Sequence, residues 1–270
     1  MPTPFTHLYL TDQFRTRLAG QANSNLLDRL SESWPAFYFG NVAPDYQSLC
    51  DVPREVTHFY SLPPLPLPNM DAGAEMLSAH PSLKIGKCAT SQQAAFVAGY
   101  LSHLLVDLAW IHTVLIPYFV ESRHFANIKE GILTHNLSLI VLDEKYRERL
   151  SSELDRVLLA AEPDQWLPFA DDENLITWRD YLADQLADSG VSYTVDIYAD
   201  RMSIPPSVLR ANLNDVEWMD ANLMTKVPLP QIEAQLEATI EKSMQRVGDY
   251  LAGVFPGHNT GPLPNIEQIQ

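Results

Sequence analysis

The chain has 270 residues, 46% of them hydrophobic, and its 34 acidic against 18 basic residues give a formal net charge of -16. This length and apolar content allow a substantial core, so we expect one large domain. So acidic a surface repels polyanions, and no nucleic-acid groove is expected. Two cysteines, Cys50 and Cys88, cannot form a disulfide framework, and the start "MPTPFTHLYL" lacks the pattern of a secretory signal. A cytoplasmic location is therefore the default expectation.

Apolar residues recur at helical spacing in seven stretches. They predict helices over residues 5–20, 24–34, 91–120, 124–160, 173–188, 205–222 and 229–253. Residues 35–69 are rich in proline and are predicted to be irregular, and so long a connection usually carries function. The segment "VSYTVDIYA" at 191–199 alternates like a strand, but it has no partner strand, so a helix or an irregular segment is preferred. The sequence thus predicts an all-α fold.

Charge and histidine are unevenly distributed along the chain. Residues 141–270 hold 23 of the 34 acidic residues, whereas seven of the eight histidines lie at or before residue 135. We therefore predict one helical domain with its chemistry in the first half. The expected organisation is a single all-helical domain over 1–254, with a metal site in 1–143 and an acidic helical extension over 144–254, and a loose tail over 255–270.

The apolar run over residues 94–120 is long enough to span a bilayer. Asp107 would then lie near the bilayer centre, where a carboxylate costs about 2.5–3.5 kcal/mol. Pro117 interrupts the run and no basic cluster flanks it. We expect the core helix of a soluble protein and no transmembrane segment.

Within that run, "GYLSHLLVDLAW" places His103 and Asp107 one helical turn apart, on the same face. A carboxylate in an apolar interior has to be paired, coordinated or protonated. An imidazole and a carboxylate at this spacing can hold a divalent cation together. A simple hydrogen bond between the two side chains is the alternative.

Other histidines and an aspartate accompany the pair in short apolar contexts. They are His7, Asp45, His58, His112, His124 and His135. His112 follows His103 by nine residues and is expected on a nearly adjacent face of the same helix. A closed site for several metal ions needs such ligands, one or two from each of several helices.

Four segments together resemble the zinc-dependent phospholipase C and S1/P1-type nuclease superfamily. They are His7 near the start, "GNVAPD" ending in Asp45, "THF" with His58, and "GYLSHLLVDLAW". The resemblance covers about residues 2–143. It implies an all-helical phospholipase C/P1 nuclease-like bundle around a zinc cluster.

The resemblance also implies roles for these residues. Asp45, His58, His103 and Asp107 match the ligands of one zinc, and Asp107 bridges to a second metal. His7 matches a ligand of that second metal, which family members also bind through the mature N-terminal amine. We hypothesise that Pro2 supplies this amine once Met1 is removed.

The third zinc of the family is the point where this chain departs from the pattern. His112 suits one ligand, but a second His-x-x-x-Asp/Glu pair is missing, because Ile128 and Leu139 stand four residues after His124 and His135. Asp143 is a possible substitute, eight residues after His135. His135 is the first choice to complete this site and His124 the second, so two or three zinc ions are expected.

These features together predict a zinc-dependent phosphoester hydrolase that acts by metal-activated water on a phospholipid or another small phosphodiester. Asp45 is the candidate general base. Arg54 is expected to form an ordinary surface salt bridge rather than to face a substrate phosphate. The alternative is a non-catalytic binding or assembly protein whose metal site is structural or degenerate. The number of subunits is left open.

Overall fold

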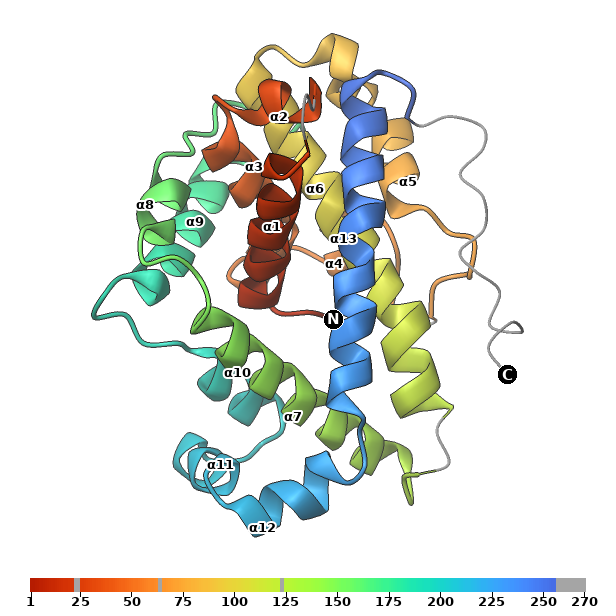
Figure 1. Cartoon of the computed structure of the whole chain (residues 1–270), viewed down its shortest axis with the longest axis vertical. Helices are drawn as coiled ribbons and strands as arrows, with labels where there is room; N and C mark the ends of the chain where they lie inside the picture. Colours follow the sequence, from red (N-terminus) through yellow and green to blue (C-terminus); the bar gives the residue numbers. More distant parts are fainter. Residues whose placement is uncertain (22–24, 63–64, 122–123, 256–270) are drawn as a thin grey trace.

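The computed structural model describes residues 1–21, 25–62, 65–121 and 124–255, and within them the chain is helical with no strand (Figure 1). The all-α prediction is confirmed. The α-helices are α1 (Pro4–Ala19), α2 (Asn25–Leu30), α3 (Trp34–Gly40), α4 (Arg54–His58), α5 (Ala72–Ala79), α6 (Ser91–Trp110), α7 (Ile128–Arg147), α8 (Leu154–Leu159), α9 (Asp172–Leu186), α10 (Thr194–Arg201), α11 (Pro206–Leu213), α12 (Val216–Met219) and α13 (Leu229–Leu251). Short 3-10 helices cover η1 (Ala43–Ser48), η2 (Pro81–Leu83) and η3 (Ile85–Lys87), and π-helices cover η4 (Ile111–Val120) and η5 (Asp220–Met224).

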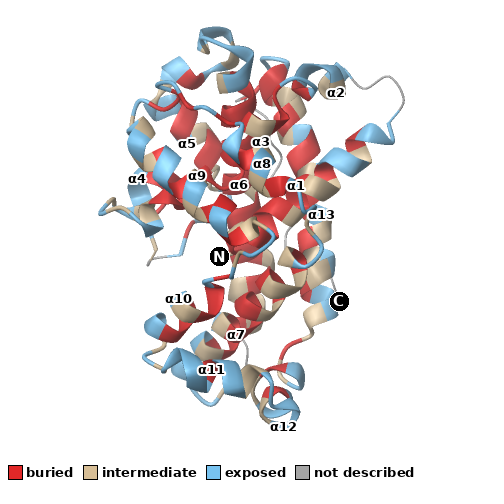
Figure 2. Ribbon diagram, turned by 90° about the vertical axis from the view of Figure 1, so that its left-hand side faces the viewer, coloured by how far each residue is buried: buried red, intermediate tan, exposed pale blue. Residues whose placement is uncertain are grey.

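Helix α6 forms the centre of the fold. It packs against α3, α5 and α13, while α1 lies against α7 and α13. Figure 2 shows the buried residues concentrated in α6 and α1, with exposed residues prominent on α11 and α12. The stretch Ser91–Val120 is long and apolar enough to cross a membrane, but 94% of its most apolar window is buried by the rest of the chain. In this structure the stretch therefore forms part of the core.

Two glycines allow α3 and α6 to cross in close contact. A Cβ atom on Gly99 would lie 2.3 Å from the Phe37 carbonyl oxygen, and one on Gly40 would lie 2.1 Å from that of Phe96. Both obstacles are backbone atoms, which cannot rotate away. The contact also positions Asn41, whose carbonyl oxygen is bound by His103.

Gly99→Ala is expected to destabilise the fold by about 1–3 kcal/mol, because the added methyl group forces the two helices apart. Thermal unfolding should shift downward by a few degrees, about 2–4 °C for each kcal/mol. Gly86→Ala is the control, since a Cβ atom there meets nothing within 4 Å. Equal melting temperatures for the two variants would contradict the close crossing.

Several predicted boundaries were wrong. Residues 35–69 are not wholly irregular, because they contain most of α3, η1 and α4. Pro35 and Pro44 stand in the first turns of α3 and η1, and Pro53 is the N-cap of α4, positions at which proline is compatible with a helix. The predicted helix over 124–160 is divided between α7 and α8, and that over 205–222 is interrupted before Asp215, which caps α12 through the Trp218 amide.

Two further segments, 191–199 and the end of the chain, bear on the predictions. The segment 191–199 is irregular over 191–193 and then enters α10, in agreement with the preference for a helix or an irregular segment. Of the predicted tail over 255–270, only Phe255 is described, and it is buried with the guanidinium of Arg246 over its ring. The rest of the tail lies outside the described residues. Whether 1–254 forms one domain stays a prediction.

Candidate metal centre

Five of the predicted ligands come together from four separate elements. Their donor atoms form two overlapping groups, His7–His103–Asp107 and Asp45–His58–His103, in each of which all donors lie within 4.8 Å of one another. His7 comes from α1, Asp45 from η1, His58 from the end of α4, and His103 and Asp107 from α6. All five are buried.

The Asp45–His58–His103 group, together with the neighbouring Asp107, has distances typical of a tetrahedral zinc site. His58 Nε2 lies 3.4 Å from Asp45 Oδ1, 3.5 Å from Asp107 Oδ2 and 3.4 Å from His103 Nε2. His103 Nε2 lies 3.6 Å from Asp107 Oδ2. Nitrogen and oxygen ligands at about 2.0–2.1 Å from a tetrahedral zinc are about 3.4 Å from one another. The four distances, each of which involves His58 or His103, thus match the separation between ligands of one ion.

The hydrogen bonds on the far side of each ring leave the inward nitrogens as acceptors. His103 Nδ1 donates to the carbonyl oxygen of Asn41 at 2.8 Å. The hydroxyl of Thr57 donates to the Arg54 carbonyl, so it accepts from His58 Nδ1 at 2.7 Å. In the neutral rings, both Nε2 atoms then direct lone pairs at each other and at two carboxylates. Such facing acceptors require a cation or a shared proton between them.

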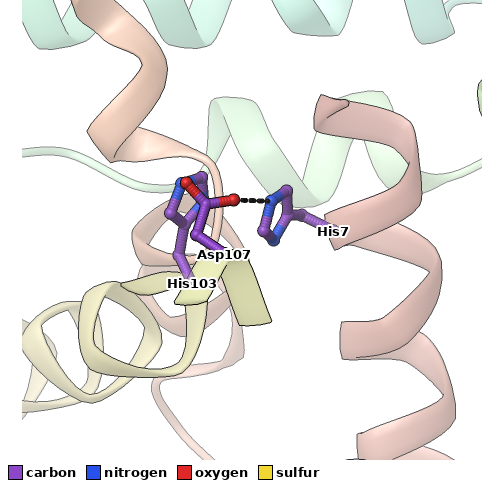
Figure 3. Close-up of side chains that lie close together, drawn as sticks. All are labelled: His7, His103 and Asp107. Carbon is purple, nitrogen blue, oxygen red and sulfur yellow. Dashed lines mark ion pairs between the residues drawn. The ribbon is translucent and has the colours of Figure 1, made fainter. Parts of the chain in front are cut away.

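The His7–His103–Asp107 group is centred on the other oxygen of Asp107. His7 Nε2 lies 3.4 Å from Asp107 Oδ1, and the rings of His7 and His103 stack with centroids 3.9 Å apart (Figure 3). Among the described residues, neither ring nitrogen of His7 nor Asp107 Oδ1 has a hydrogen-bond partner. Buried polar atoms without partners are rare and point to an additional ligand. Asp107 therefore presents one oxygen to each group, as a bridging carboxylate does.

Asp143 holds the start of α1 and, through it, His7. Its Oδ1 accepts from the backbone N–H groups of Phe5 and Thr6 at 3.1 and 3.3 Å and from the hydroxyl of Thr3. Its Oδ2 accepts from Thr194 of α10. Asp143 thus acts as the N-terminal cap that the side chain of Thr3 does not supply. The sequence suggested Asp143 as a substitute metal ligand, but these contacts do not support that role.

Arg54 was wrongly expected to form an ordinary surface ion pair. Its Nη2 donates to Asp107 Oδ2 at 2.7 Å and lies 3.0 Å from the hydroxyl of Tyr60, which itself donates to the same oxygen at 2.9 Å. Its Nη1 lies 3.6 Å from Asp45 Oδ1. Arg54 stands one helical turn before His58 on α4, and the left-handed conformation of Phe59 (φ 59°) then turns the chain toward Tyr60. Because Arg54 and His58 are four residues apart, the i, i+4 rule could have placed Arg54 on the same helix face as His58 and so at the metal centre.

The charges of the cluster favour ionised carboxylates beside mostly neutral rings. Burial alone would raise the pKa of Asp45, but the His58 hydrogen bond and the nearby positive charges hold it well below its usual range. The pKa of Asp107 is likewise low, since His103, His7 and Arg54 outweigh its burial. Burial lowers the pKa of His7 and of His58 to about 4. For His103, burial is outweighed by Asp107 and Asp45, which raise its pKa.

Zinc binding is accordingly expected to release about one proton per chain near pH 6, where a zinc-bound water is still largely protonated, and that proton should come from His103. A raised pKa means that the metal-free protein keeps this proton to higher pH, whereas His7 and His58 are already neutral. Titration calorimetry in buffers of different ionisation enthalpy measures the release, and two or more protons at pH 6 would contradict the assignment.

The predicted ligands of the third zinc lie outside both groups. His112 is in η4 and its buried Nε2 has no hydrogen-bond partner among the described residues. The expectation of a face adjacent to His103 was wrong, because nine residues at about 100° each give two and a half turns. His135 Nε2 accepts from Trp110 Nε1 at 3.1 Å, and His124 is exposed. Their roles as ligands stay predictions.

The first residues of the chain lie at the site. Burial lowers the pKa of the Met1 amine to about 5, with Asp107 and Asp45 opposing the shift. A cavity of about 420 Å³ opens beside Met1 and Pro2. Asp45 and Arg54 line it, together with residues of α9 and α10. The proposed role of the Pro2 amine stays a prediction.

Comparison with known proteins agrees with this arrangement. The family model described as zinc dependent phospholipase C matches residues 6–188, which extends beyond the 2–143 expected from the motifs and includes all of α9. No curated protein and no solved structure matches the chain. Because the family model covers more than half of the chain, and the buried histidines and aspartates have the spacing of zinc ligands, the chain belongs to the zinc-dependent phospholipase C family.

Proposed function

We propose that the protein hydrolyses a phosphodiester bond in a phospholipid or another small phosphoester with the help of two zinc ions. The observation that carries the proposal is the bridging position of Asp107, one of whose oxygens faces His7 while the other faces His58 and His103. Asp45, His58, His103 and Asp107 would hold one ion, and His7 and Asp107 the other. Family membership supports the same activity.

Bound zinc supplies two kinds of chemistry, a lowered pKa of water and neutralisation of charge on phosphoryl oxygens. The residues of the chain orient the ligands and balance the charge of the site. Asn41 and Thr57 fix the orientation of the His103 and His58 rings. Arg54, which lines the cavity beside Asp45, is placed to balance the charge of the carboxylates and of an incoming phosphate.

Asp45 is the proposed proton acceptor from the attacking water. It lines the cavity, and its side chain is 11% exposed, the most accessible of the two buried carboxylates of the site. Its low pKa keeps it ionised across the neutral range, and proton transfer to it would depend on the lowered pKa of a zinc-bound water. Asp45→Asn should then reduce turnover more than it reduces zinc content.

Metal content and turnover, measured together, test the proposal. Protein purified without chelator should contain about two zinc ions per chain and release p-nitrophenol from a phosphodiester or a phosphocholine ester. One tightly held zinc without turnover on any phosphodiester would instead favour the non-catalytic scaffold that the missing His-x-x-x-Asp/Glu pair suggests. A third ion remains a finer proposal, with His112 and His135 as its candidate ligands.

A further inference from the structure

The cavity beside the metal centre has an unusual charge for so acidic a chain. Its lining contains two arginines, Arg54 and Arg201, and its one carboxylate among the described residues is Asp45. Asp45 and Arg54 are both engaged at the metal centre. Arg201, at the end of α10, is exposed, and among the described residues no carboxylate forms an ion pair with it.

The remaining wall is apolar and aromatic, with Trp178, Tyr181, Ile197 and Tyr198 among its residues. Aromatic walls can bind quaternary ammonium groups when ring faces are open. Here the guanidinium of Arg201 lies 5.0 Å from the ring centroid of Tyr198. Tyr181 is already stacked on Trp178 with centroids 5.6 Å apart. A cationic headgroup would therefore meet an arginine rather than an open ring.

We propose that this cavity selects phosphoesters in which the group beyond the scissile phosphate carries a second negative charge, and that Arg201 binds this charge. The inference rests on the proposed hydrolase function and adds the substrate class. The phosphate lies at the Asp45–Arg54 end of the cavity, and the second anion, a carboxylate or a phosphate, lies toward α10. A choline-like headgroup is disfavoured because it places a positive charge beside Arg201.

Three small phosphate monoesters test this selection by their dissociation constants for the zinc-loaded protein. Phosphoglycolate carries a second anion, ethyl phosphate carries none, and phosphocholine carries a cation in its place. A charge-assisted hydrogen bond should make phosphoglycolate bind about ten- to hundredfold more tightly than ethyl phosphate. Phosphocholine should bind more weakly than both.

Arg201→Gln should remove the preference for phosphoglycolate while leaving the affinity for ethyl phosphate within about twofold. Arg156→Gln is the matched control, because it removes the same charge from an exposed position on α8 outside the cavity lining. Both variants should keep the zinc content and melting temperature of the unmodified chain. A preference that survives in Arg201→Gln would show that the carboxylate binds zinc itself, and would overturn the role of Arg201.

The outcome can be separated from that of the proposed hydrolase function. A protein that hydrolyses no phosphodiester would refute the hydrolase proposal, but the binding comparison would still be measurable. A protein that hydrolyses phosphodiesters yet binds phosphocholine as tightly as phosphoglycolate would overturn the selection alone. Loss of the preference in Arg156→Gln would also overturn it, because the effect would then come from net charge.

Discussion

Asp107→Asn is expected to lower the zinc content from about two ions per chain to less than one and to reduce kcat/KM by about 1000-fold or more. The two oxygens of Asp107 face different metal positions, Oδ1 toward His7 and Oδ2 toward His58 and His103. Asparagine keeps the shape but has one oxygen and no charge. One of the two positions therefore loses a ligand and the other loses most of its electrostatic attraction. Elemental analysis of protein purified without chelator measures the loss.

The exposed Asp164 offers a control of the same chemistry, since Asp164→Asn removes one carboxylate outside the metal centre. That variant should keep both ions and full turnover. Circular dichroism should show that Asp107→Asn is still folded, because the substitution removes a buried charge without leaving a cavity. Two zinc ions retained in Asp107→Asn would mean that the carboxylate does not bridge, and the two groups would have to be considered separately.

The parts of the site that the sequence predicted are those governed by local geometry or by the motifs of the family. His103 and Asp107 follow from the i, i+4 rule on an apolar helix, and the structure brings them together. His7, Asp45 and His58 were assigned through the resemblance, and the structure places them at the same point. The five side chains thus lie together in the structure, and their role as metal ligands stays a prediction.

What the sequence did not predict depends on tertiary contacts. Tyr198 and Arg201, which line the cavity, follow Asp45 by about 150 residues in the sequence, and no local pattern connects α10 with the metal centre. Residues 144–254 were predicted as an acidic helical extension without an assigned role, yet they supply these cavity-lining residues and the Thr194 hydroxyl that donates to Asp143. The prolines of residues 35–69 were taken as helix breakers, although several of them begin helices.

Removal of zinc by a chelator is expected to lower the melting temperature by at least about 8 °C. A ligand at a thousandfold excess over its dissociation constant stabilises the native state by about 4 kcal/mol, and each kcal/mol corresponds to about 2–4 °C in a chain of this size. In the metal-free site, Asp45 and Asp107 keep their burial, and among the described residues Arg54, Tyr60 and the histidines balance their charge. Calorimetric melts with zinc and with EDTA measure the difference.

The same melts on Asp107→Asn distinguish a metal effect from a general effect of the chelator. Because this variant is expected to hold little zinc, EDTA should change its melting temperature by less than about 2 °C, and excess zinc should stabilise it only weakly. An equal shift in both proteins would place the stabilising ion elsewhere. Turnover then separates the two interpretations of the site, because a structural ion and a catalytic pair both stabilise the fold, but only the pair, with Asp45 beside the cavity, supports hydrolysis.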